Sequence, residues 1–216
     1  MILSEFNKRI ISSLILIPFS FFCFLEGGIV FAIFLTICCI ISIYEWNKMI
    51  NKKIPLYIGY IFILFSFFSS NYLRSEYNNY NLYYFLFIMV CCISTDIGGF
   101  TIGKILKGPK LTNISPNKTY SGVAGGYLFA FILTSLYVLT YTKVTNQVHN
   151  LKFNLIIMIL VISTISQIGD ITISYFKRSA KIKDTGNIIP GHGGILDRID
   201  GMLFVFPVIF ILEKYL

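Results

Sequence analysis

The stretch "LKFNLIIMILVISTISQIGDITISYFKR", residues 151–178, is an almost unbroken apolar run that ends in two basic residues. The run 151–176 is longer than the roughly 20 residues that a helix needs to cross a hydrocarbon core about 30 Å thick. One carboxylate, Asp170, interrupts it. A charged side chain inside a span costs about 2.5–3.5 kcal/mol on insertion scales, so such a residue indicates function. The stretch predicts a transmembrane helix that carries a functional acid.

Further apolar runs precede and follow this one, at about 10–25, 28–45, 54–70, 82–106, 122–142 and 200–213. The chain is 56% hydrophobic and only 13% charged, whereas soluble domains carry about 25% charged residues. Segments that alternate like the strands of a membrane β-barrel are absent. We therefore expect an all-α, polytopic membrane bundle of about seven transmembrane helices. It forms one domain, 1–216, with N-terminal helices in 1–95 and a catalytic part in 96–216.

The net charge of +8 follows the expected topology. If the N-terminus is inside, 14 of the 18 lysines and arginines fall in inner segments. This positive-inside bias predicts a cytoplasmic N-terminus. No soluble basic domain exists to bind nucleic acid, so we expect no nucleic-acid partner.

The acidic residues are distributed unevenly. The glutamates lie near helix ends or in loops, where solvation is the default; they are Glu5, Glu26, Glu45, Glu76 and Glu213. Every aspartate lies in or beside the stretches 94–126 and 167–201; these are Asp96, Asp170, Asp184, Asp197 and Asp200. Acids gathered with basic clusters suggest a hard cation that binds phosphates. A structural salt-bridge network that caps two helices remains the alternative.

Helical spacing groups some of these residues. Asp170, Ser174 and Lys177 stand at i, i+4 and i+7, on one face of their helix. Asp197 and Asp200 are three residues apart at the start of the last helix, and Arg198 turns away from them. The preceding "PGHGG", 190–194, has little side-chain bulk. Such a backbone can approach a phosphate closely, in front of a helix N-terminus that favours anions.

The other polar stretch contains two short motifs. "GGFTIGKI", 98–105, resembles a P-loop but has Ile105 at the Ser/Thr position and no preceding strand. We interpret Gly99 and Gly103 as a small-xxx-small face for helix packing. "SPNKT", 115–119, offers Ser115, Lys118 and Thr119 as donors beside a proline turn, which suggests a phosphate clamp.

The segment "SYFKRSAKIKDTGNIIPGHGGILDRID", 174–200, resembles the signature of the phosphatidate cytidylyltransferases, the CDP-diacylglycerol synthases. Upstream elements are similar too, from Asp96 through "GK", 103–104, to "SPNKT" and Gly122. Ser121 departs from the pattern, since the family usually has an acid there. The resemblance extends over essentially the whole chain.

The resemblance implies that CTP and phosphatidate react to CDP-diacylglycerol and pyrophosphate. It implies Mg²⁺ held by Asp170 and Asp197, with a second, monovalent cation as an option, and a homodimer. The positive-inside bias places both polar stretches on the cytoplasmic side. The high content of Ile, Asn, Lys and Tyr is typical of an AT-rich bacterial genome, so we expect an integral protein of a bacterial inner membrane with its active site facing the cytoplasm. Because the phosphatidate oxygen is already ionised, no protein nucleophile is needed, and His192 is expected to contact phosphate or nucleotide.

The residues expected to act in catalysis are Asp170, Asp197, Lys177 and Arg198. Those expected to bind substrate are Asp96, Ser115, Lys118, Thr119, Ser174, Arg178, Lys183, Asp184, His192, Gly193 and Asp200. A membrane transporter for an anionic solute is the alternative function; it predicts inverted repeats and polar residues near the bilayer midplane. A CDP-alcohol phosphatidyltransferase would need a D-x-x-D-G-x-x-A-R motif, which the chain lacks.

Overall fold

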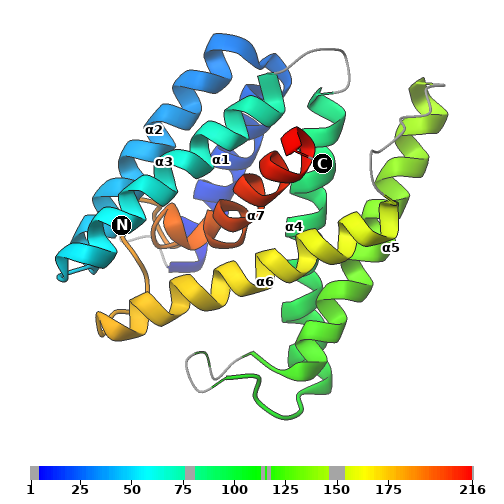
Figure 1. The fold of residues 1–216 in the computed structure, drawn as a ribbon. Helices are drawn as coiled ribbons and strands as arrows, with labels where there is room; N and C mark the ends of the chain where they lie inside the picture. The colour runs from blue at the N-terminus through cyan, green and yellow to red at the C-terminus, as the bar shows by residue number, and fades with distance from the viewer. Residues whose placement is uncertain (1–4, 76–80, 113–114, 116–117, 146–153, 216) are drawn as a thin grey trace.

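Seven helices make up the computed structural model, which describes residues 5–75, 81–112, 115, 118–145 and 154–215 (Figure 1). They are α1 (Glu5–Glu26), α2 (Gly28–Met49), α3 (Lys53–Ser75), α4 (Asn81–Leu106), α5 (Tyr120–Thr145), α6 (Leu155–Ser179) and α7 (Leu196–Tyr215). Within these described ranges only isolated β-bridges occur and no strand. The prediction of an all-α bundle built on seven apolar runs is confirmed.

Six of the helices, α1 to α6, are long and apolar enough to cross a membrane. The exception is α7, which carries acids and bases in both its first and last turns. Its middle is nonetheless apolar and lies inside the protein, where Leu203, Val205 and Ile209 are at most 3% exposed. The seventh apolar run is therefore a core helix of the bundle. Many large apolar side chains on the other helices are exposed, as expected for a surface that faces lipid.

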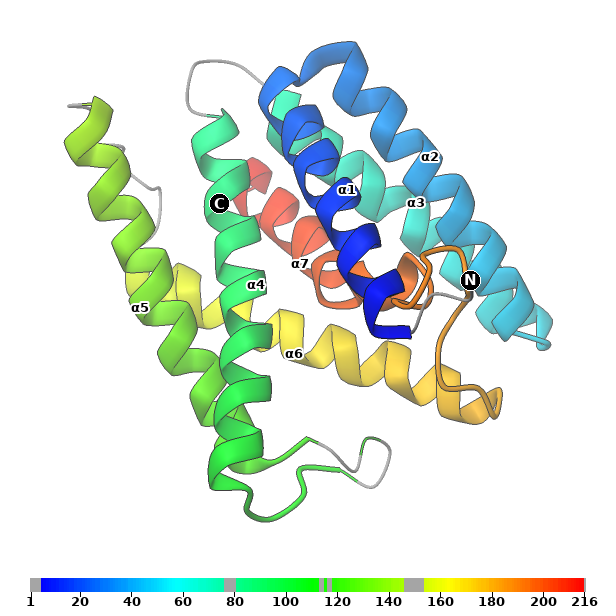
Figure 2. The same ribbon diagram turned by 180° about the vertical axis from the view of Figure 1, so that it is seen from behind.

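Helices α1 to α3 form one group and helices α4 and α5 form another, and α6 and α7 join the two groups. The α1–α2 hairpin turns at Gly27 and Gly28, which have φ angles of 65° and 51° that favour glycine. Helix α3 packs against α2, and α4 packs against α5. Helix α6 runs obliquely across α4 and α5, and α7 lies between α3 and α6 (Figures 1 and 2). The polar segments around α6 are thus supplied by both groups.

The close pairing of α4 and α5 depends on glycine. A Cβ added at Gly122 would lie 2.9 Å from the carbonyl oxygen of Gly99, and one added at Gly98 would collide with the carbonyl of Gly125. A Cβ at Gly103 would lie 3.3 Å from Gly122 Cα. This confirms helix packing for these glycines, as predicted in place of a P-loop.

Two apolar clusters hold the bundle together. The larger joins α2, α4, α6 and α7 through fully buried side chains such as Phe31, Phe87 and Ile159. The smaller includes Trp46 of α2, Ile173 of α6 and Leu196 of α7. It lies directly beside the polar residues at the start of α7, so apolar packing fixes that end of the site.

Candidate functional site

An open cavity of about 280 Å³ lies between α4, α5, α6 and the connection between α4 and α5. Its polar lining includes five of the residues singled out by the sequence, together with Gln167, which the sequence reasoning missed. The five are Asp96, Ser115, Lys118, Thr119 and Asp170. Stretches more than 50 residues apart in the chain therefore meet in one place.

A salt bridge crosses this cavity. The Lys118 Nζ lies 2.5 Å from Asp170 Oδ2, and both side chains are partly accessible, at 23% and 32%. The other oxygen, Asp170 Oδ1, accepts a hydrogen bond of 3.3 Å from Ser174 Oγ, as the i, i+4 spacing predicted. Lys118 thus holds an ammonium group at the carboxylate in a space that remains open.

The chain brings Lys118 to this position through a folded-back connection. The N–H of Leu111 donates to the Lys118 carbonyl at 2.8 Å, and the N–H of Tyr120 donates to the Pro109 carbonyl at 3.2 Å. Thr119 Oγ1 then accepts from the N–H of Gly122 at 3.1 Å and caps the start of α5. Thr119 is therefore partly a structural residue. Pro116 and Asn117, in the middle of the predicted clamp, lie outside the described residues.

Two further acids lie near Asp170: Asp96, which also lines the cavity, and Asp200 at the start of α7. Asp96 of α4 and Asp200 of α7 each feel repulsion from Asp170, and Asp200 also feels repulsion from Asp96. Lys118 attracts Asp96, and Lys177 attracts Asp200. Helix packing places the backbones closely, since a Cβ at Gly169 would lie 2.9 Å from the Asp200 carbonyl. Three carboxylates from three helices therefore share this region.

A second group of polar residues, which we name the closed cluster, consists of Asp197, Lys177, Thr185, Gly194 and Glu45. Asp197 Oδ1 accepts from Lys177 Nζ at 2.8 Å. Asp197 Oδ2 accepts from the N–H of Thr185 at 2.7 Å and from the N–H of Gly194 at 3.0 Å, with Thr185 Oγ1 at 3.1 Å. The Asp197 side chain is only 4% exposed. Both of its oxygens are occupied by donors from within the protein.

The electrostatics of the closed cluster favour ionised Asp197, which precedes the apolar run of α7. Burial raises the pKa of Asp197, but the hydrogen bonds from Lys177 and from the N–H groups of Gly194 and Thr185 outweigh that effect. The pKa is consequently below the ordinary value. The cluster is a buried, charge-assisted network of the kind left open as an alternative in the sequence.

Glu45 corrects the expectation that the glutamates are solvated. Its side chain is 1% exposed, because α2 places it against the loop before α7. It accepts hydrogen bonds from the N–H groups of Ile195 at 3.0 Å and Leu196 at 2.9 Å, and from Thr185 Oγ1 at 2.8 Å. Nothing in the sequence around Glu45, "IYEWNK", indicated this burial.

His192 contacts helix α1. Its Nδ1 lies 2.8 Å from Ser12 Oγ, and its Nε2 lies 3.2 Å from Ser13 Oγ. Arg9 Nε donates to the Gly191 carbonyl at 2.8 Å, which fixes the same turn. The positive φ of Gly193, 87°, lets the chain reverse there. Whether His192 also contacts a nucleotide stays a prediction.

The remaining predicted residues lie at the surface. Arg178, Lys183, Asp184 and Arg198 are exposed. Arg178 donates to the Ile182 carbonyl at 3.1 Å, and Arg198 donates twice to the His192 carbonyl, at 3.1 and 2.6 Å. Arg198 does turn away from Asp197, as its position on the helix predicted. None of these four side chains lines the open cavity.

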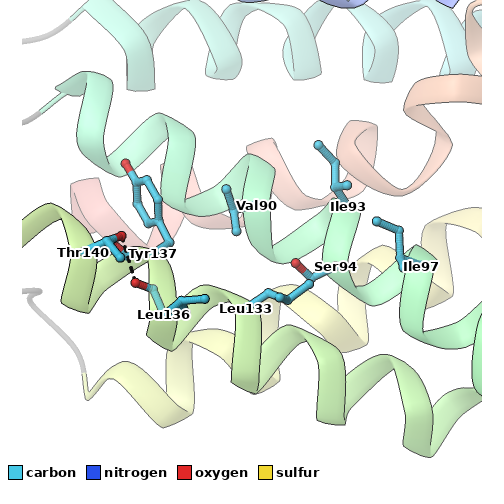
Figure 3. Close-up of a pocket in the computed structure, with 8 residues that line it drawn as sticks. All are labelled: Val90, Ile93, Ser94, Ile97, Leu133, Leu136, Tyr137 and Thr140. Atoms are coloured by element: carbon cyan, nitrogen blue, oxygen red, sulfur yellow. Dashed lines mark hydrogen bonds between the residues drawn. The ribbon is translucent and has the colours of Figure 1, made fainter.

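Another cavity, of about 390 Å³, lies between α4 and α5 on a different part of their surface. Figure 3 shows its lining, which is apolar except for a few hydroxyl groups and includes Ile93, Ile97 and Leu133. It contains no charged side chain. The chemistry suggested by the sequence therefore belongs to the open cavity and the closed cluster.

The donor set of these two places suits a hard cation only in part. Among the side chains that the structure describes, no three His, Cys, Asp or Glu residues form a ready metal cage. Mg²⁺, however, is usually bound by one or two carboxylates together with waters and substrate phosphates. Asp170, with the neighbouring Asp96 and Asp200, fits that mode of binding. Asp197 fits it less well, because Lys177 Nζ occupies its Oδ1 at 2.8 Å, and a cation at that oxygen would have to displace the ammonium group.

Comparison with known proteins agrees with this chemistry. Residues 54–216 match the cytidylyltransferase family. A phosphatidate cytidylyltransferase of Rickettsia conorii is 34% identical over 218 residues, covering 99% of this chain and 93% of that protein. The enzyme of the same name from Bacillus subtilis is 40% identical over 136 residues, covering 62% and 49%, and that from Staphylococcus aureus is 40% identical over 156 residues, covering 72% and 56%. The resemblance carried by residues 174–200 is confirmed, and the chain belongs to the cytidylyltransferase family.

Proposed function

We propose that this protein is a phosphatidate cytidylyltransferase, which converts CTP and phosphatidate to CDP-diacylglycerol and pyrophosphate. The observation that carries the proposal is the open cavity, where Lys118 and the carboxylates Asp96 and Asp170 meet at the boundary of apolar helices. A cavity with such charges suits phosphate groups and cations. The similarity to phosphatidate cytidylyltransferases over nearly the whole chain supports the choice of substrates.

In the proposed reaction an oxygen of the phosphatidate phosphate attacks the α-phosphorus of CTP. A new P–O bond forms to the lipid phosphate, and the bond between the α-phosphorus and the oxygen that bridges to the β-phosphorus breaks. Pyrophosphate leaves with the electron pair. Both reactants are anions, so the site must neutralise charge and hold the two phosphates in line. No protein nucleophile is required.

Lys118 and Lys177 are the cations best placed for this task. Each is paired with a carboxylate, Lys118 with Asp170 at 2.5 Å and Lys177 with Asp197 at 2.8 Å. We propose Asp170 and Asp197 as the Mg²⁺ ligands, where binding at Asp197 requires Lys177 to leave Oδ1. A second, monovalent cation belongs to the same proposal. When bound, Mg²⁺ would neutralise phosphate charge and stabilise the leaving pyrophosphate. Asp96 and Asp200 are the neighbouring acids whose repulsion such a cation relieves.

The proposal includes a place in the cell: a bacterial inner membrane, with the open cavity on the cytoplasmic side where CTP is present. It is supported by six helices that suit a bilayer and by the basic residues expected on the side of the N-terminus. A homodimer is also part of the proposal. The anionic-solute transporter receives no support from the relatives, which are cytidylyltransferases.

The test is a CTP-dependent assay with the purified protein in detergent or proteoliposomes. With radiolabelled CTP, phosphatidate and Mg²⁺ we expect a labelled lipid and one pyrophosphate released per lipid formed. Omission of phosphatidate, or excess EDTA, should abolish both products, and added Mg²⁺ should restore them after EDTA. A folded protein that forms no labelled lipid under these conditions would refute the proposal.

A further inference from the structure

Glu45 is a buried carboxylate that the proposed chemistry does not use. It lies on α2, outside the residues 54–216 that match the family, and it is 1% exposed. Among the residues that the structure describes, it forms no salt bridge; its contacts are the three hydrogen-bond donors at Thr185, Ile195 and Leu196. Two of these donors are backbone N–H groups at the start of α7, where the helix dipole favours an anion. A carboxylate from another helix therefore caps α7.

The glycines around this carboxylate indicate that the contact is specific. A Cβ added at Gly186 would lie 2.7 Å from Glu45 Oε1, and one added at Gly194 would collide with Glu45 Oε2 and Thr185 Oγ1. Neither glycine has a positive φ, so backbone strain does not account for them. The small residues of this loop give room to a carboxylate of the protein itself.

Thr185 connects Glu45 to Asp197. Its hydroxyl lies 2.8 Å from Glu45 Oε2 and 3.1 Å from Asp197 Oδ2, and its backbone N–H donates to Asp197 Oδ2 at 2.7 Å. One hydroxyl proton serves one acceptor at a time. The N–H of Gly194, directly before two residues bound to Glu45, also donates to Asp197. Glu45 thus fixes the backbone groups that fix Asp197 and, through it, Lys177.

We infer that Glu45 is a positioning residue for cytidylyl transfer, which holds Asp197 and Lys177 in their working orientation through Thr185 and the start of α7. The inference rests on the proposed function. A misplacement of about 1 Å in such a site can lower the rate about 10²-fold. Glu45 does not line the open cavity, so its loss changes kcat and leaves the KM for CTP nearly unchanged.

The first variant is Glu45→Gln, which preserves the volume but puts an amide donor where one oxygen accepts. We expect kcat to fall about 10²-fold, with the KM for CTP within about threefold of wild type. Ser42→Ala is the matched control, because Ser42 lies on the same helix, is 0% exposed and donates only within that helix, to the Cys38 carbonyl at 2.7 Å. The control should keep wild-type kcat.

A second pair of variants tests the route through Thr185 and remains usable if Glu45→Gln does not fold. Thr185→Val removes the hydroxyl but keeps the backbone N–H, and Thr185→Ser keeps both. We expect Thr185→Val to lower kcat about tenfold, the change that 1.36 kcal/mol of barrier represents. Thr185→Ser should keep most of the wild-type kcat, because the hydroxyl remains. Combining Glu45→Gln with Thr185→Val should lower kcat less than the product of the two single effects, because both act on one network.

These measurements distinguish positioning from a merely structural role. All rates are measured per folded protein, well below the melting temperature of each variant. A lower melting temperature with unchanged kcat in Glu45→Gln, or equal rates in Thr185→Val and Thr185→Ser, would overturn the inference alone. A folded wild type without phosphatidate-dependent consumption of CTP would instead overturn the proposed function, and the inference with it.

Discussion

Asp170 lines the open cavity and Asp197 lies in the closed cluster. The environments of these two predicted metal ligands differ in exposure and in hydrogen bonding. Asp170 is one-third exposed, has one lysine partner and repels two neighbouring acids. Asp197 is 4% exposed, and donors from three residues saturate both of its oxygens. One half of the site is therefore pre-organised by the fold, whereas the other half stays accessible to cations and phosphates.

Neutralising each of the two acids in turn should have the largest effect. We expect both Asp170→Asn and Asp197→Asn to lose essentially all cytidylyl transfer. Asp170→Asn should keep the melting temperature, because a partly exposed ion pair contributes only about 0–1 kcal/mol. Asp197→Asn should unfold more easily, because removing one partner of a buried pair costs about 3–5 kcal/mol.

Activity assays and thermal unfolding in detergent, with membrane insertion as a control, measure these effects. Near wild-type turnover in either variant would contradict the metal assignment. Equal loss of stability in the two variants would contradict the distinction between an open and a closed half.

The lysines provide a somewhat smaller contrast. Lys118→Met should raise the KM for CTP about tenfold, equivalent to about 1.4 kcal/mol of binding, with little change in stability. Lys177→Met leaves the buried Asp197 without its cation, so it should lower both kcat and the melting temperature. Steady-state kinetics with thermal unfolding distinguish the two patterns, and exchanged patterns would contradict the proposed division of roles.

Two glycines sharpen the comparison through packing alone. Gly194→Ala should destabilise the protein by about 1–3 kcal/mol, the usual cost of overpacking, because its Cβ would collide with Glu45 and Thr185. Gly99→Ala is the matched control on α4, since its Cβ would lie 3.6 Å from the nearest atom, the Gly122 carbonyl oxygen. Chemical unfolding in detergent measures the free energy of unfolding of both variants. An equally small loss of stability in the two variants would contradict the tight enclosure of Glu45.

The smallest expected effect is on the pH dependence of stability in metal-free protein. The folded pKa of Asp197 is below its ordinary value, so the unfolded state binds more protons. The stabilisation is therefore complete above about pH 4, the unfolded pKa, and is lost as the pH falls through the folded pKa. Unfolding curves between about pH 2 and 6 should show this loss in wild type. If the Asp197→Asn variant lost the same stability over this acid range as wild type, the loss could not be assigned to Asp197.

Much of the site could be predicted because its chemistry contrasts with its surroundings. Asp96 and Asp170 stand out inside apolar runs, and the 3.6-residue period correctly pairs Asp170 with Ser174. The positions of Lys118 and Lys177 could be predicted only as basic residues near acids. Which lysine pairs with which aspartate depends on the turn before α5 and on the crossing of α6 and α7.

The bundle of apolar helices, the glycine packing of α4 on α5 and the set of acids and bases with phosphate chemistry could all be predicted from the sequence. The physical reason is that hydrophobic length and helical period are local properties. The burial of Glu45, the contact of Ser12 with His192 and the burial of α7 in the core became evident only from the packed helices. The contacts of Glu45 and of Ser12 join residues 140 or more positions apart, and the partner of such a contact leaves no periodic signal in the sequence.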